Sequence, residues 1–453
     1  MYDLIIIGGG PAGYTAAERA GHAGMNVLLF EKKSMGGVCL NEGCIPTKTL
    51  LYSAKILDNG IKGDKYGVYG SDFRIDFGKI MARKNKVVRK LVIGVETKMK
   101  SNRVEVIKGE ASITGRTADG VEVVCNGETF SGKALLVCTG SEAFVPPIDG
   151  LNEAFEAEIV VTNREILGLK TPPESLVIVG GGVIGMEFAC FFSAIGTKVT
   201  VIEMLPEILN GVDVEMAEQL REIYVKRGIE FHLNSRVMKI DRNKVSFEKG
   251  GELLYAEGEK ILVSVGRKAV VSGFGLENTG VEFTSRGIAV DEKLATNIPG
   301  IYAAGDVTGF SLLAHTASRE GEVVVNNLLG MNDVMSYRAI PAVVYSFPEI
   351  AAVGETEKSA ADKGIAYRVV KLPMAYSGRF VAENEGVNGL FKMLVDENTQ
   401  QIIGVHIFGN PASEMIFGAC IAIEKRLTVD ELKKVVFPHP TVSEIFRESL
   451  FEF

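Results

Sequence analysis

The chain has 453 residues, of which 46% are hydrophobic, and it carries a formal net charge of −8. This length is typical of about three domains, and the acidic balance argues against nucleic-acid binding, which needs a basic face. No apolar run reaches the roughly 18 residues of a membrane span, and six cysteines are too few for a disulfide framework in a chain of this length.

The first residues predict a dinucleotide-binding unit. An apolar strand, Leu4–Ile7, leads into Gly8, Gly10 and Gly13 and a small-residue helix, and a second strand over 27–30 ends at Glu31. In such a unit the glycines allow a tight turn, close approach of the backbone to a pyrophosphate, and packing of helix on strand. The helix N-terminus offers N–H donors to phosphates, and Glu31 would accept hydrogen bonds from ribose hydroxyls.

The N-terminus lacks the charged flank, apolar core and cleavage site of a secretory signal. We therefore expect a cytoplasmic protein in a reducing compartment, unless a targeting peptide has been removed.

Two cysteines, Cys39 and Cys44, follow the first unit at a spacing of five positions. Such a pair serves as a structural disulfide, as half of a metal site or as a redox-active pair. Zinc would need two more Cys or His ligands at suitable spacing, so we expect no metal, and a reducing compartment disfavours a structural disulfide. We predict a redox-active pair, with thiolate pKa values lowered by Lys48 and by a glycine-flanked turn before a helix.

A second dinucleotide unit begins near residue 176. The strand Leu176–Val179 leads into Gly180, Gly182 and Gly185, and a strand over 198–202 ends at Glu203; in both units the acid stands 23 positions after the first glycine. A carboxylate there binds a 2′-hydroxyl and repels a 2′-phosphate, and no arginine follows it directly. This pattern predicts NAD rather than NADP as the second cofactor.

Three further strand-plus-glycine signals fit these two units. They are 134–137 before Thr139, Gly140 and Ser141, then 261–265 before Gly266, and 301–304 before Gly305 and Asp306. Asp306 would bind the hydroxyls of a ribityl chain, or cap a helix that begins near Leu312, or do both.

A separate C-terminal region begins near Tyr337, with antiparallel strands expected over 389–395 and 401–408 and helices from Ser413 and Thr428. His439 stands between two prolines, and Glu444 follows five positions later. The carboxylate can bond one ring nitrogen and hold the tautomer, so that the other nitrogen can take a proton from a dithiol.

Taken together, the glycine units, the cysteine segment, Ala303–Asp306 and Pro438–Glu444 resemble the pyridine nucleotide–disulfide oxidoreductases over essentially the whole chain. Within that family the dihydrolipoamide dehydrogenases are the most similar. The resemblance implies an α/β fold with two Rossmann-like dinucleotide-binding domains and a C-terminal α+β dimerisation domain. The expected divisions are an FAD-binding domain (1–145 and 265–335), an NAD-binding domain (146–264) and an interface domain (336–453).

The resemblance also assigns roles to residues. Cys39 would form the mixed disulfide with substrate, Cys44 would face the flavin, and His439 would reach the cysteine pair of the other subunit of a homodimer. FAD would lie in the first unit and NAD in the second, with Val237 and Gly266 near NAD. The other expected flavin contacts are Lys48, which would pair with Glu187, and Ala111, Thr139, Gly140, Ser141, Asp306, Ala314 and His315.

The implied reaction oxidises protein-bound dihydrolipoamide to lipoamide, with electrons passing through the cysteine pair and FAD to NAD⁺. The partner would be a lipoyl-bearing protein of a 2-oxo acid dehydrogenase complex or of the glycine cleavage system. The main alternative is another small-disulfide reductase of the same family, which Glu203 disfavours because those reductases generally prefer NADPH. A flavin transhydrogenase or oxidase, or a non-catalytic docking subunit, is opposed by the complete set of Cys39, Cys44 and His439.

Overall fold

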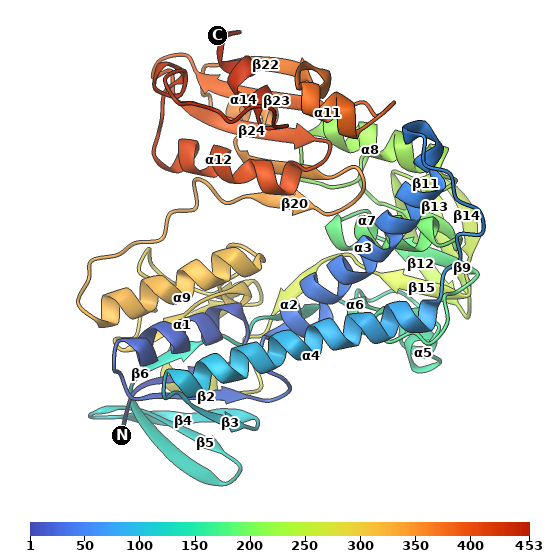
Figure 1. Ribbon diagram of the computed structural model, residues 1–453. Helices are drawn as coiled ribbons and strands as arrows, with labels where there is room; N and C mark the ends of the chain where they lie inside the picture. The colour runs from blue at the N-terminus through green and yellow to red at the C-terminus, as the bar shows by residue number, and fades with distance from the viewer. The chain divides into compact units, whose positions relative to one another are not determined.

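The computed structural model describes residues 1–453, which form two compact units (Figure 1). The first unit comprises Met1–Thr49, Lys79–Val145 and Gly266–Ser336. The second comprises Leu50–Gly78, Pro146–Val265 and Tyr337–Phe453.

The first unit is built on a seven-stranded sheet. Its strands run in the order β3 (Glu105–Lys108), β2 (Val27–Glu31), β1 (Tyr2–Ile7), β6 (Glu128–Val137), β5 (Gly120–Cys125) and β4 (Ala111–Thr117), and β19 (Ile301–Ala303) also pairs with β6. Strand β1 pairs in parallel with β2 and β6. Its residues Leu4–Ile7 are all buried, as expected for a parallel strand that is covered on both faces.

Helices α1 (Pro11–His22) and α9 (Ala314–Leu328) pack side by side in this unit (Figure 1). The close contact depends on small residues, because a Cβ on Gly321 of α9 would clash with the backbone of Ala12 in α1. The unit also contains the helix α2 (Gly37–Glu42), the start of α3 (Cys44–Ile61) and most of α4 (Phe77–Ser101). Two short strand pairs are β7 (Ser141–Ala143) with β16 (Arg267–Ala269) and β17 (Phe283–Thr284) with β18 (Gly287–Ile288). The 3₁₀ turns are η2 (Leu276–Thr279) and η3 (Asp306–Thr308).

A five-stranded parallel sheet carries the second glycine motif. Its order is β11 (Glu230–His232), β10 (Lys198–Ile202), β9 (Ser175–Val179), β15 (Lys260–Val263) and β8 (Val160–Val161). The motif lies between β9 and α7 (Val183–Ala194). The neighbouring elements are α5 (Leu151–Glu156), α6 (Asn163–Ile166), α8 (Val214–Lys226) and the antiparallel strands β12 (Ser235–Asp241), β13 (Lys244–Lys249) and β14 (Glu252–Glu257).

The C-terminal part of the second unit is a five-stranded antiparallel sheet with helices packed on it. The strand order is β20 (Ala342–Val344), β21 (Ile350–Gly354), β24 (Ile402–Phe408), β23 (Leu390–Asp396) and β22 (Tyr367–Pro373). Buried residues of α12 (Ala412–Glu424) share one apolar core with β23 and β24. The remaining elements of this part are α10 (Glu357–Asp362), α11 (Gly378–Glu383), α13 (Val429–Leu432), α14 (Glu444–Leu450) and η4 (Met374–Tyr376). The segment Leu50–Gly78 of the same unit contains the rest of α3 and the turn η1 (Gly63–Tyr66).

The expected fold class is confirmed: a mixed sheet in the first unit and a parallel sheet in the second each carry a glycine motif, and an α+β region follows. The helix-cap interpretation of Asp306 was wrong. Asp306 begins the turn η3, and α9 starts only at Ala314, with Leu313 in the cap position. No helix combines the length and the apolar character needed to cross a membrane.

Candidate active site

The two glycine motifs have the same local geometry. The N–H of Gly9 donates a hydrogen bond to Oε2 of Glu31 at 2.8 Å, and the N–H of Gly181 donates to Oε2 of Glu203 at 2.5 Å. Each acid therefore lies against the residue between the first two glycines of its own motif. The equal spacing seen in the sequence corresponds to equal placement of the two carboxylates in space.

Both helix N-termini have room for a pyrophosphate. The N-cap residues, Gly10 and Gly182, have no side chain to cover the helix N-terminus. A Cβ on either would have no heavy-atom neighbour closer than 3.9 Å. In contrast, a Cβ on Gly13 or Gly185 would clash with the first glycine of its own motif. The backbone is thus open where phosphates would approach and closed where helix packs on strand, which fits dinucleotides at both motifs.

Asp306 belongs to a polar chain in the first unit. Ser141 donates from Oγ to Oδ2 of Asp306 at 2.5 Å, and Arg267 donates from Nε to Oγ of Ser141 at 2.7 Å. The pairing of β7 with β16 brings Ser141 and Arg267 together. Arg267 was not among the predicted site residues, although its place directly after Gly266 was a signal for it.

Glu320 was also missed from the sequence. Its side chain is fully buried in α9, and its Oε2 accepts the N–H of Gly305 at 2.5 Å. The carboxylate therefore holds the backbone directly before Asp306. A glutamate within the buried stripe formed by Ala317 and Val324 was the available signal, because a carboxylate is rarely buried without a partner.

Cys39 and Cys44 lie together at the junction of two helices. Cys39 is in α2, Cys44 is the first residue of α3, and both are free thiols that share a hydrogen bond. This hydrogen bond and burial raise the pKa of Cys39, while the charge of Lys48 acts in the opposite direction. The predicted lowering of the thiolate pKa is therefore wrong for Cys39 in the dithiol form. Glycines do flank the segment before α3, as expected, but the segment is the short helix α2 rather than a turn, and Cys39 lies in it.

The expected histidine–carboxylate pair is present in the second unit. Nδ1 of His439 lies 2.7 Å from Oε1 of Glu444, and Oε2 of Glu444 accepts the N–H of Thr441 at 2.9 Å. The pKa of Glu444 is lowered by its hydrogen bonds with His439 and Thr441. The His439 side chain is 80% exposed. With Nδ1 bound to the carboxylate, Nε2 is the ring nitrogen left for proton transfer.

The remaining predicted residues divide between the two units. Glu187 is buried in α7, where its Oε1 accepts the N–H of Tyr345 at 3.1 Å, and Val237 is in β12. Both belong to the second unit, together with the glycines of the second motif and Glu203. The first unit contains Lys48, Ala111, Thr139, Gly140, Ser141, Gly266, Asp306, Ala314 and His315.

Comparison with known proteins gives matches over the full length. The family model described as pyridine nucleotide-disulphide oxidoreductase matches residues 2–321, and the dimerisation-domain model of the same description matches 340–450. The chain is 38% identical over 455 residues to the dihydrolipoyl dehydrogenase of Geobacillus stearothermophilus, covering 99% of this chain and 95% of the relative. Identity to the Bacillus subtilis dihydrolipoyl dehydrogenase is 36%, over 99% and 97% of the two chains.

Solved structures agree in fold. LpdA from Mycobacterium tuberculosis superposes with a TM-score of 0.90 at 27% identity, over 100% of this chain and 99% of that one. The HOCl-induced flavoprotein disulfide reductase RclA from Escherichia coli superposes with a TM-score of 0.86 at 29% identity, over 99% of both chains. Since the family models match residues 2–321 and 340–450 and a relative is 38% identical over 99% of the chain, the chain belongs to the pyridine nucleotide-disulphide oxidoreductase family.

Proposed function

We propose that this protein oxidises dihydrolipoamide to lipoamide and reduces NAD⁺ to NADH, with FAD as its bound cofactor. The observation that carries the proposal is the hydrogen-bonded thiol pair, Cys39 with Cys44, in a unit that also has an open dinucleotide motif. The full-length relatives that are dihydrolipoyl dehydrogenases support the choice of substrate.

The residues of the first unit would hold FAD. The open N-terminus of α1 would receive its pyrophosphate, and Glu31 and Asp306 would bind its ribose and ribityl hydroxyls. The second motif would hold NAD in the same way, with Glu203 at the adenosine ribose. Bound FAD would supply the two-electron step that connects the cysteine pair with NAD⁺.

The chain's own residues account for the thiol chemistry. In the oxidised enzyme, Nε2 of His439 removes a proton from one substrate thiol, and the resulting thiolate attacks Cys39 of the disulfide. The Cys39–Cys44 bond breaks, Cys44 leaves as a thiolate, and Lys48 favours this charge. The second substrate thiol then attacks the mixed disulfide, its proton passes to the leaving sulfur of Cys39, and lipoamide leaves while the cysteine pair retains two electrons.

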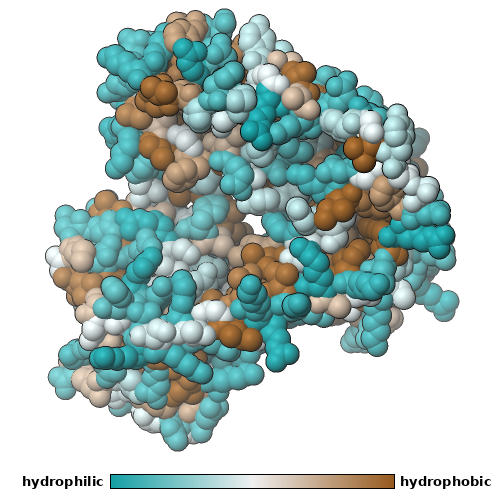
Figure 2. Space-filling view, viewed as in Figure 1, coloured by the Kyte–Doolittle hydropathy of each residue, from teal (hydrophilic) through white to brown (hydrophobic).

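We place His439 at the cysteine pair of the partner subunit in a homodimer. The match of residues 340–450 to a dimerisation domain supports this arrangement. Large apolar side chains in this region are exposed, including Phe417 at 69% and Val436 at 91%. The space-filling view shows apolar atoms among hydrophilic ones over the C-terminal part of the chain (Figure 2). Covering these side chains with a second subunit would remove apolar area from water.

The physiological partner would be a lipoyl-bearing protein of a 2-oxo acid dehydrogenase complex or of the glycine cleavage system.

We place the reaction in the cytoplasm, since Cys125, Cys138 and Cys190 are buried free thiols, as expected in a reducing compartment. The second candidate function is reduction of another small disulfide, which the similarity to RclA favours.

The test is the initial rate of NAD⁺ reduction by the FAD-loaded protein with free dihydrolipoamide. NADP⁺ in place of NAD⁺ is one control, and oxidised glutathione with NADPH is the other. We expect a fast rate with NAD⁺ alone. A bound flavin that NADH reduces, without any dihydrolipoamide rate, would instead favour the second candidate.

A further inference from the structure

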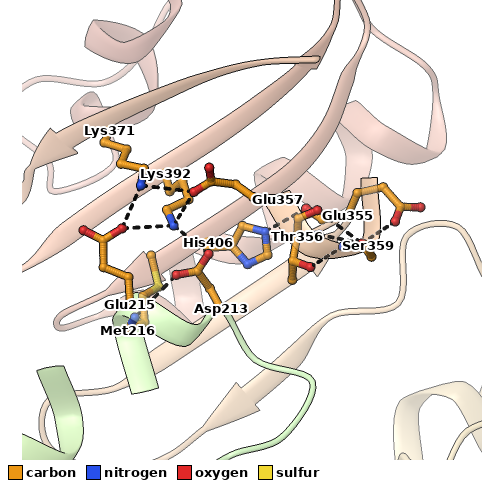
Figure 3. Close-up of polar contacts among 10 residues, drawn as sticks. All are labelled: Asp213, Glu215, Met216, Glu355, Thr356, Glu357, Ser359, Lys371, Lys392 and His406. Carbon is orange, nitrogen blue, oxygen red and sulfur yellow. Dashed lines mark hydrogen bonds and ion pairs between the residues drawn. The ribbon is translucent and has the colours of Figure 1, made fainter. Parts of the chain in front are cut away.

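A buried lysine of the C-terminal sheet pairs with acids at the start of α8 (Figure 3). Lys392 is in β23, and its side chain is only 2% exposed. Its Nζ lies 2.6 Å from Oδ2 of Asp213, 2.9 Å from Oε1 of Glu357 and 3.1 Å from Oε2 of Glu215. Lys371 of β22 bonds the same two glutamates, at 2.9 Å from Glu215 and 3.1 Å from Glu357. We call these five residues the Lys392 cluster.

Asp213 has two partners in this cluster. Its Oδ2 binds Lys392, and its Oδ1 accepts the N–H of Met216, which makes Asp213 the N-cap of α8. Because Asp213 is 96% buried, neither bond can be replaced fully by water. The ion pair with Lys392 therefore fixes the position of Asp213, the last residue before α8.

That segment, 203–213, begins at the acid of the second motif. Oε1 of Glu203 accepts the N–H of Leu205 at 2.8 Å, and the N–H of Leu209 donates to the carbonyl of Gly181 at 2.9 Å. The segment is thus bonded to the glycine motif at its first residue, Glu203, and again at Leu209. The other end is bonded to the Lys392 cluster through Asp213.

Between these two ends the segment borders a cleft of about 1220 Å³. Residues 205–215 form one side of the cleft, and residues of the C-terminal part, including Arg338, Thr356 and Gln401, form the other. All five residues of the Lys392 cluster line it as well. Along this cleft the Lys392 cluster connects the end of the segment to the C-terminal sheet through ion pairs.

We infer that Lys392 is a positioning residue for NAD: through Asp213 it fixes segment 203–213, and so holds Glu203 where the adenosine ribose would bind. The inference rests on the proposed function, since it concerns the same nucleotide. Hydrogen bonds to Asp213 and Glu357 outweigh the effect of burial and raise the pKa of Lys392, which keeps the ammonium charged.

The test compares Lys392→Met with Lys358→Met in the FAD-loaded enzyme. Lys358 is a matched control, because it is an exposed lysine of the same region that pairs only with Asp362 in its own helix. We expect Lys392→Met to weaken NAD⁺ binding at least tenfold by calorimetry and to speed amide hydrogen exchange over 204–213. The KM for dihydrolipoamide and the kcat at saturating NAD⁺ should stay within twofold. Lys358→Met should leave all four quantities within twofold of wild type.

A second variant keeps the test decisive if Lys392→Met does not fold. Asp213→Asn combined with Lys392→Met leaves no unpaired charge at Asp213 and keeps a good N-cap. It should show the same loss of NAD⁺ affinity and the same faster exchange. Unchanged affinity and exchange in a folded variant would overturn the inference alone, whereas wild-type protein that binds no NAD⁺ would overturn the proposed function and the inference with it.

Discussion

The Nδ1 atom of His439 and the Oε1 atom of Glu444 lie 2.7 Å apart within one chain. The direction of the imidazole is therefore set before any partner subunit or substrate is present. The ring itself is 80% exposed, so its free nitrogen is accessible to a group that another molecule brings. This combination of a fixed orientation and open access is what a base that acts across a subunit interface needs.

Replacing His439 with Gln should separate the two halves of the reaction. Without the base, we expect dihydrolipoamide oxidation to fall by about 10²- to 10⁴-fold. Electron transfer from NADH to a dye through FAD should continue nearly unchanged, since no substrate thiol is deprotonated there. Both rates are measured on the same preparation, and an equal loss of both would contradict the assigned role.

Glu444→Gln should have a smaller effect than His439→Gln. Gln can still contact Nδ1, but it lacks the charge that stabilises the imidazolium, so we expect the rate to fall by about tenfold or more, or about 1.4 kcal/mol. Steady-state kinetics with dihydrolipoamide measure the loss, and thermal unfolding controls for damage to α14. A wild-type rate in this variant would show that the carboxylate has no part in proton transfer.

Glu203→Gln should reduce the preference for NAD⁺ over NADP⁺. Removing the charge removes repulsion of a 2′-phosphate, while the amide oxygen can still accept from the N–H of Gly181. We expect the ratio of kcat/KM for the two nucleotides to fall by about tenfold, or about 1.4 kcal/mol. Glu230→Gln, a change of a largely exposed acid in the neighbouring strand β11, is the control and should leave this ratio unaltered.

Cys44→Ala should lower the pKa of Cys39. Cys44 raises that pKa through a hydrogen bond and through repulsion between two thiolates, and the variant removes both causes while the effect of Lys48 remains. The pH profile of Cys39 alkylation, followed by peptide mass mapping, should move to lower pH relative to the reduced wild type. An unmoved profile would mean that burial alone sets the reactivity of Cys39.

His406 should make the protein less stable in mild acid. Burial lowers its pKa, and Nε2–H donates to the carbonyl of Glu355 at 2.8 Å beside the Lys392 cluster (Figure 3). In the unfolded chain the imidazole binds a second proton and becomes charged below its ordinary pKa of about 6.5. The contribution of His406 to stability is therefore complete above pH ~6.5 and is lost as the pH falls toward its lowered folded-state pKa.

Urea unfolding of the FAD-loaded enzyme between pH 5 and 8 tests this expectation. The midpoint should fall below pH ~6.5 in wild type and should fall less in His406→Gln, because glutamine keeps a donor for Glu355 and does not titrate. A parallel slope in the two proteins would assign the acid sensitivity to other groups.

Local spacing made much of the candidate site predictable. The glycine–acid distances and the five positions from His439 to Glu444 lie within single motifs, and the structure places each set together. Contacts across long sequence distances left no such signal: Lys392 and Asp213 are 179 positions apart. The direction of the Cys39 pKa shift was missed for another reason, since it depends on how two thiols point toward each other.

Each carboxylate oxygen of Glu203 already accepts one backbone N–H, one from Gly181 and the other from Leu205. Replacing this acid with a basic residue, in order to bind a nucleotide with a 2′-phosphate, would also remove these two hydrogen bonds to the surrounding backbone. Successful redesign of coenzyme preference in this chain should therefore replace the whole 203–209 segment rather than a single side chain.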